Sequence, residues 1–157
     1  LQAAESIGPN FYAAEADIGG PRSHTMILED TPKGFRVDWE YYVQYNPMNW
    51  STFLKEMPAA PMDFRVYANL APDYRHPFND ESRYIGVNLM TLNDTSEIMG
   101  YAERDSELGK RIEQFLANKH EELCILRLQF ATPPNPDTVH IRELVNPHWI
   151  ITDETPD

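Results

Sequence analysis

From residue 35 onward, apolar and polar positions follow a regular pattern along the chain. Phe35, Val37, Trp39, Tyr41 and Val43 occupy every second position, and most of the residues between them are charged. Alternation with a period of two predicts a half-buried strand, here over residues 35–43. Later alternating or apolar stretches predict further strands at 64–70, 84–92, 97–103, 123–130 and 138–145.

Two stretches with helical spacing interrupt these strands. Trp50, Phe53, Leu54 and Met57 follow the spacing i, i+3, i+4, i+7, which predicts one face of a short helix with Asn49 as its N-cap. A second helix is expected to begin at Asp105 or Ser106. Its predicted apolar face consists of Leu108, Ile112, Phe115 and Leu116.

Residues 1–33 show no sustained period and are interrupted by Gly-Pro and Gly-Gly-Pro sequences. This composition predicts an arm with at most a short strand at 25–28. The apolar residues of this arm could dock on the rest of the chain or on a partner, so an oligomer formed through residues 1–33 is one expectation. The predicted organisation is an arm (1–33), an added strand and helix (34–62), a barrel (63–151) and a tail (152–157), with 34–151 forming one domain.

The order of elements from Phe64 onward is three strands, a helix and two strands. This order resembles the OB-fold, a small, partly open barrel. The resemblance implies an α+β or mainly β fold, an OB-like partly open barrel with an extra N-terminal strand and two short helices. It also implies binding rather than catalysis, because OB-folds hold ligands on one sheet face and in the adjoining loops.

Acidic residues outnumber basic ones in every part of the chain, and the net charge is −12. Lys and Arg count 4 against 8 Asp and Glu in residues 1–62, 4 against 7 in 63–104, and 5 against 10 in 105–157, which sum to 13 and 25. A nucleic-acid backbone would therefore meet repulsion, and nucleic-acid binding is not expected. No apolar run approaches the roughly 20 residues of a membrane-spanning helix. The chain starts at Leu1 rather than Met, which favours a removed leader and an extracytoplasmic location such as the periplasm, although a cytoplasmic one stays open.

Motifs of catalysis and cofactor binding are missing from the sequence. It has no G-x-S-x-G sequence, no glycine-rich phosphate loop, and no second histidine to complete a zinc motif with His120. Cys124, the one cysteine, lies in an apolar run and is expected to be buried. No catalytic residue, cofactor or metal ligand is therefore predicted. One alternative is a metal-dependent enzyme with a site near His76, Asp80 and Glu81.

The candidate binding residues lie on the two strands after the 71–82 loop. Tyr84, Asn88 and Met90 share one face of the first strand, and Met99 and Tyr101 share a face of the next. Arg83 and Arg104 flank this set, and His140 is expected on the outer surface of the last strand. The sequence thus predicts a non-enzymatic domain that binds a protein segment or small polar ligand here, unless the N-terminal strand or helix covers this face. A second interpretation is a structural module of a larger envelope or secreted assembly.

Overall fold

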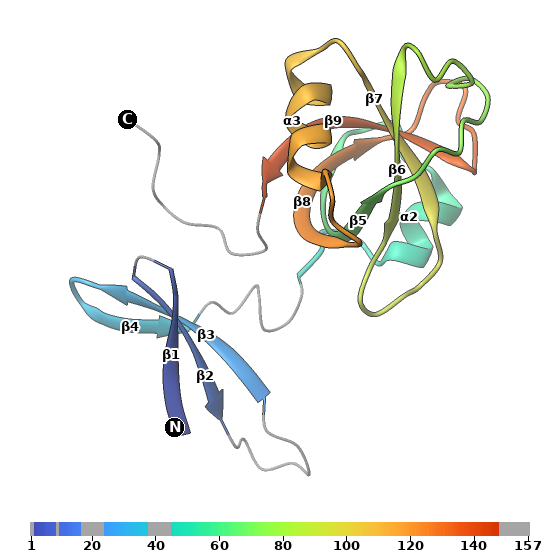
Figure 1. Cartoon of the computed structure of the whole chain (residues 1–157). Coiled ribbons are helices and arrows are strands. Elements are labelled where there is room, and N and C mark those ends of the chain that lie inside the picture. Colours follow the sequence, from blue (N-terminus) through green and yellow to red (C-terminus); the bar gives the residue numbers. More distant parts are fainter. Residues whose placement is uncertain (1, 9, 17–23, 38–44, 148–157) are drawn as a thin grey trace. The chain divides into compact units, whose positions relative to one another are not determined.

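The computed structural model describes residues 2–8, 10–16, 24–37 and 45–147 (Figure 1). The chain divides into two compact units, Leu1–Tyr45 and Asn46–Asp157. Among the described residues, none of the helices has the length and apolar character needed to cross a membrane.

The N-terminal unit is a four-stranded antiparallel sheet. Its strands, in spatial and sequence order, are β1 (Gln2–Gly8), β2 (Phe11–Ala16), β3 (His24–Thr31) and β4 (Gly34–Val37). The expectation that residues 1–33 form an arm with at most a short strand at 25–28 is wrong, because β1, β2 and β3 all lie within residues 1–33. Residues 38–44 of the predicted strand 35–43 lie outside the described residues. β4 pairs with β3, so residues 34–37 belong to this sheet and to the N-terminal unit, whereas they were expected in an added strand within the domain 34–151.

Consecutive apolar residues explain why the sequence pattern did not reveal this sheet. Met26, Ile27 and Leu28 are adjacent, so β3 places apolar side chains on both of its faces and shows no alternation. Few side chains are fully buried here, and Phe35 and Val37 on β4 are 63% and 41% exposed.

The second unit contains a closed barrel of five strands. These are β5 (Met62–Leu70), β6 (Tyr84–Met90), β7 (Ile98–Glu103), β8 (Glu122–Gln129) and β9 (Thr138–Asn146). Their order around the barrel is β5-β6-β7-β9-β8, and β5 pairs with β8 to close it. β7 and β9 run parallel, and all other neighbours are antiparallel. The α+β or mainly β fold predicted from the sequence is confirmed, and the barrel is closed rather than partly open.

Alternate residues of each barrel strand fill the interior. On β6 these are Ile85, Val87 and Leu89, as their spacing predicts, and all three are at most 2% exposed. Residues from the other four strands complete this core, namely Phe64, Val66, Ala68, Ile98, Ala102, Cys124, Leu126, Leu128, Val139, Ile141 and Leu144. Both helices add buried side chains to this same core.

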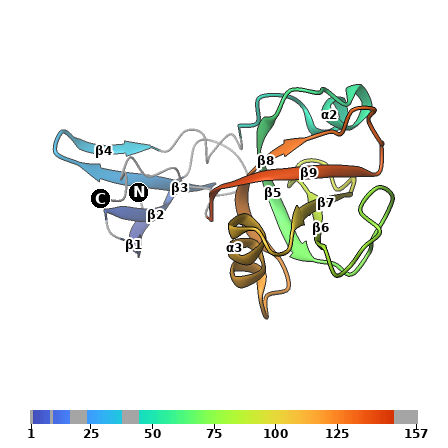
Figure 2. The same cartoon turned by 90° about the horizontal axis from the view of Figure 1, so that it is seen from above.

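Two helices lie on opposite sides of the barrel (Figure 2). α2 (Trp50–Glu56) packs Phe53 against Phe64 and Phe130, with ring centroids 4.4 and 4.9 Å apart. Trp50 Nε1 also donates a hydrogen bond of 2.8 Å to the carbonyl of Ser96. Asn49 is at the N-cap of α2 in extended conformation, but its side chain makes no capping hydrogen bond.

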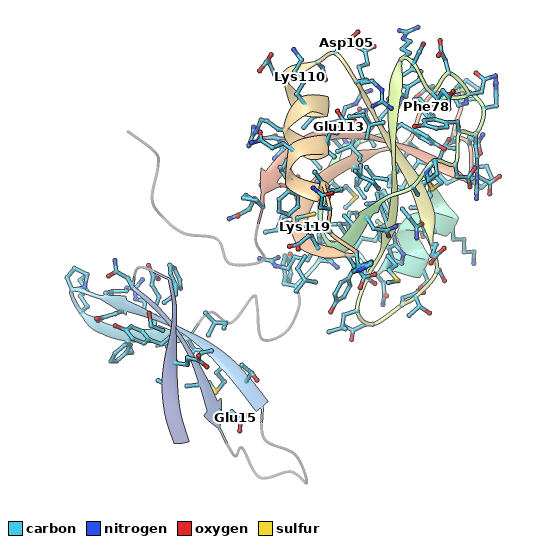
Figure 3. All side chains as sticks on the ribbon, viewed as in Figure 1. Glu15, Phe78, Asp105, Lys110, Glu113 and Lys119 are labelled. Atoms are coloured by element: carbon cyan, nitrogen blue, oxygen red, sulfur yellow. The ribbon has the colours of Figure 1, made fainter. Side chains whose placement is uncertain are left out.

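α3 (Glu107–Leu116) connects β7 to β8 and confirms the second predicted helix. Ser106 caps it, because its Oγ accepts a hydrogen bond of 3.0 Å from the Gly109 amide. Ile112 and Leu116 are buried in the barrel core, with Leu108 and Phe115 packed against it. This places the polar face of α3, including Glu113, beside the start of the 71–82 loop (Figure 3).

Candidate functional site

The predicted binding residues on β6 and β7 do share one outer face of the barrel. Asn88 pairs with Met99 and Gly86 pairs with Tyr101, so the side chains of these strands alternate in step. Because Ile85, Val87 and Leu89 point inward, Tyr84, Asn88 and Met90 point outward. The three side chains thus point away from the barrel interior, as their spacing in the sequence predicts.

The predicted exposure of Met99 and Tyr101 is wrong. They are 3% and 1% exposed, because the 71–82 loop folds over them and forms a small second core. Phe78 of this loop stacks on the Tyr101 ring, with centroids 4.6 Å apart and an interplanar angle of 16°. Phe78 also makes edge-to-face contacts with Tyr84 and His140, with centroids 5.1 and 4.6 Å apart. Within the unit Asn46–Asp157, this cover comes from the 71–82 loop. Residues 38–44 of the predicted N-terminal strand lie outside the described residues.

Hydrogen bonds hold the loop to Tyr101 and to the turn before β9. The Tyr101 hydroxyl donates to the Asp73 carbonyl at 2.6 Å and accepts from the Arg75 amide at 3.1 Å. Burial raises the pKa of this Tyr101 hydroxyl. Further along, Asn135 Nδ2 donates to the His76 carbonyl at 2.7 Å and ties the loop to the turn before β9. A ligand could reach the Met99 and Tyr101 side chains only by displacing the loop.

Glycine at position 86 lets the start of the loop approach β6 closely. A Cβ atom on Gly86 would lie 2.5 Å from the Ala71 carbonyl oxygen and 3.3 Å from Met99 Cε. The Ala71 amide donates to the Gly86 carbonyl at 3.0 Å. A side chain at this position would separate the loop from the strand.

The remaining predicted residues do not form a common site. Tyr84, Asn88 and Met90 are half-buried along β6. Arg83 is exposed and pairs with Glu103 at 3.3 Å, where both side chains are 62% exposed. Such an exposed pair contributes little to stability or binding. Arg104 behaves differently from Arg83, because it is fixed by several partners.

Arg104 links β6, the 71–82 loop and α3. Its Nε donates to the Glu81 carbonyl at 3.2 Å, and its Nη2 donates to the Tyr84 carbonyl at 3.0 Å. Nη2 also contacts the Tyr74 hydroxyl at 3.4 Å, and Nη1 pairs with Glu113 Oε1 at 2.7 Å. The guanidinium plane is therefore fixed by the fold before any ligand arrives.

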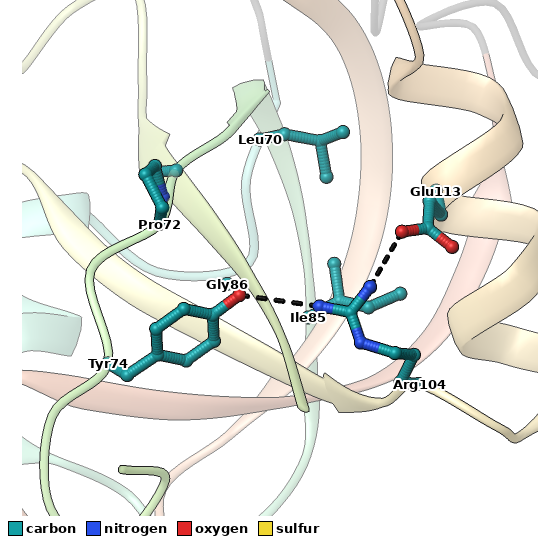
Figure 4. Close-up of a pocket in the computed structure, with 8 residues that line it drawn as sticks. Leu70, Pro72, Tyr74, Ile85, Gly86, Arg104 and Glu113 are labelled. Atoms are coloured by element: carbon teal, nitrogen blue, oxygen red, sulfur yellow. Dashed lines mark hydrogen bonds and ion pairs between the residues drawn. The ribbon is translucent and has the colours of Figure 1, made fainter. Parts of the chain in front are cut away.

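A pocket of about 160 Å³ opens beside this arginine (Figure 4). Leu70, Pro72 and Ile85 bring apolar side chains to its lining, to which Ala71 and Gly86 also belong. Tyr74, Arg104 and Glu113 bring the polar groups. Concave apolar sites with a few convergent polar groups are typical of small-ligand sites.

The residues of the alternative metal site do not converge. Asp80 accepts hydrogen bonds from the Ser82 hydroxyl and amide at 2.6 and 3.0 Å, and these bonds lower its pKa. In residues 2–8, 10–16, 24–37 and 45–147, no group of three or more His, Cys, Asp or Glu side chains is arranged to hold a metal ion. His76, Asp80 and Glu81 are exposed at separate points of the loop.

Cys124 and His140 are less accessible than reactive groups would be. Cys124 is 1% exposed, as predicted, and burial raises the pKa of its thiol to about 12. His140 lies on the outer surface of β9, but Phe78 half-buries it, and this burial lowers its pKa. Neither group lines the pocket beside Arg104.

Sequence reasoning missed Tyr74, Phe78 and Glu113. Tyr74 and Phe78 stand in a polar, proline-marked loop, where no periodicity shows which aromatic side chains turn inward. Two aromatic residues in a loop of twelve were the available signal for a loop that packs on the barrel. Glu113 lies on the polar face of α3, where its partner could be identified only from the tertiary structure.

Comparisons with known proteins found no relative of this chain. No family model, curated protein or solved structure matches it.

Proposed function

We propose that this chain is a non-enzymatic binding domain on an OB-type barrel, which holds a small polar ligand or a segment of a partner protein in the pocket beside Arg104. The observation that carries this proposal is the fixed guanidinium at the rim of an apolar pocket. Because the fold already holds Arg104 in place, a ligand would pay little conformational entropy to order it.

The topology of the barrel supports the OB-type assignment. The strand order β5-β6-β7-β9-β8, the parallel pair β7 and β9, and the helix between β7 and β8 agree with the element order on which the resemblance rests. OB-folds hold ligands on the second and third strands and in adjoining loops. Here the 71–82 loop covers Met99 and Tyr101 of this face. The pocket beside Arg104, lined by Pro72 and Tyr74 of the loop and by Glu113 of α3, offers a concave surface next to it.

A fragment titration followed by amide NMR shifts tests the proposal. The panel contains small carboxylic acids, amines, amides and sugars, and the expected result is a shift at Ala71, Gly86 and Arg104. Leu70→Trp fills the pocket from its wall and should abolish these shifts. Leu92→Trp is the matched control, since Leu92 is also an exposed leucine of this unit but does not line the pocket. A panel without any shift at the pocket residues would overturn the assignment.

A second candidate function is assembly through the N-terminal sheet. The observation that favours it is the exposure of Phe35 and Val37 on the edge strand β4. Exposed apolar edge strands are templates for pairing with another chain. Light scattering should then show a larger species at micromolar concentration that Phe35→Asp dissociates, and a monomer in both cases would count against it.

A further inference from the structure

We propose that the pocket beside Arg104 binds a short alkyl chain that ends in a carboxylate, and that Glu113 occupies the carboxylate position when no ligand is bound. This inference rests on the proposed function, because it names the ligand class of the same pocket.

The first argument is the direction of the hydrogen-bond donors. Two backbone carbonyls, of Glu81 and Tyr84, accept from Nε and Nη2 of Arg104, whereas Nη1 donates to the Glu113 carboxylate, which also lines the pocket. The Tyr74 hydroxyl receives a contact from Nη2, and no described group accepts its own proton. Nη1 and the Tyr74 hydroxyl therefore offer donors at one end of the pocket (Figure 4). A carboxylate is the ligand group that two such donors select.

The second argument is that Glu113 already satisfies Arg104 in this way. Its Oε1 lies 2.7 Å from Nη1, so the pair has one contact rather than the two of a bidentate fork. The Glu113 side chain is 48% exposed, and it can rotate from α3 into solvent. The Arg104 side chain is 32% exposed, so this ion pair is partly open to solvent and is worth less than a buried one, and a ligand carboxylate can replace it.

The third argument is the apolar character of the walls. Leu70, Pro72 and Ile85 present no hydrogen-bonding side chain, which favours an alkyl chain behind the carboxylate. The volume of about 160 Å³ is below the roughly 300–1,000 Å³ of pockets that hold drug-sized ligands, which suits a short chain only. The net charge of −12 opposes anions at long range, but salt screens charges beyond about 8 Å at physiological ionic strength.

The test compares isovalerate with isoamylamine, which has the same branched chain and the opposite charge. Titration of the full chain should give a saturable shift at Gly86 and Arg104 with isovalerate and none with the amine. Glu113→Gln removes the internal competitor and should tighten isovalerate binding about threefold. Glu107→Gln is the matched control, since it removes the same charge from the same helix at a residue that pairs with Lys110 instead. Arg104→Met should weaken binding more than tenfold, against the control Arg83→Met.

The source of the carboxylate is resolved by a second comparison. A tripeptide ending in leucine is titrated as the free acid and as the C-terminal amide. Binding of the free acid alone, more tightly than isovalerate, assigns the pocket to the chain terminus of a partner. Tighter binding of isovalerate assigns it to a small free acid.

The possible failures are distinguishable. Binding of isoamylamine that Glu113→Gln weakens would overturn the carboxylate assignment and leave the pocket as a binding site for amines. Equal effects of Glu113→Gln and Glu107→Gln would overturn the competition by Glu113. If isovalerate does not bind while other fragments shift the pocket residues, this inference fails and the proposed function stands; if no fragment binds there, the proposed function fails as well.

Discussion

Replacing Phe78 by alanine tests whether the 71–82 loop is an integral part of the barrel unit. Phe78 is 2% exposed and contacts the rings of Tyr101, Tyr84 and His140. Truncation of a buried phenylalanine to alanine costs about 3–5 kcal/mol when the surrounding structure stays in place. Here the loop can detach instead, and the cost cannot exceed the free energy that holds the loop. We therefore expect a loss of about 3 kcal/mol, at the lower end of that range.

Urea unfolding followed by circular dichroism measures this loss. With a slope of about 1.5 kcal/mol/M for a unit of this size, the midpoint should fall by about 2 M. Hydrogen exchange of the Arg75 and Phe78 amides should accelerate more than exchange within β6, because both amides bond inside the covered region. Leu92→Ala removes an exposed apolar side chain and should change stability by less than about 0.5 kcal/mol. If Phe78→Ala costs no more than this control, the loop is not a cohesive cover and the reasoning is refuted.

Three further predictions concern single groups. Gly86→Ala should destabilise the barrel unit by about 1–3 kcal/mol because the new Cβ would lie 2.5 Å from the Ala71 carbonyl oxygen; calorimetry without a change in melting temperature would contradict this. Because burial lowers the pKa of His140 below 6.5, the unfolded chain binds its proton first, so stability should fall as the pH drops below about 6.5. His140→Gln should flatten that part of the stability profile, and an unchanged slope would show that other groups cause it. Cys124, with a thiol pKa of about 12, should resist iodoacetamide at pH 8 in the folded chain and react after addition of denaturant, whereas rapid labelling of the native chain would contradict its burial.

The barrel and its helices were predictable because their burial follows a simple period. Ile85, Val87 and Leu89 face the core at every second position, and Ile112 and Leu116 do so one helical turn apart. The N-terminal sheet was not predictable in this way. Its strand β3 has apolar residues on both faces, so the alternation that identifies a half-buried strand is absent.

For the candidate site, the sequence could predict only which side chains point away from the barrel interior. The alternation of apolar and polar residues correctly predicted that Tyr101 and Met99 point away from the barrel interior. It could not show that Phe78 would cover them. Packing of a loop depends on contacts between residues distant in sequence, such as Asn135 with His76 and Arg104 with Glu113. Arg104 was selected as a flanking residue, and the structure shows it as the group that joins three elements.

The position of β9 in the barrel constrains the order in which the protein can fold during synthesis. Of the five barrel strands β9 is the last to be made, yet it lies between β7 and β8 and pairs with both. While the ribosome is still adding residues 138–146, β7 and β8 each present an unpaired edge, and Phe78 lacks its contact with His140. The nascent barrel is therefore most exposed to aggregation just before its completion, whereas the four strands of the N-terminal sheet are available much earlier.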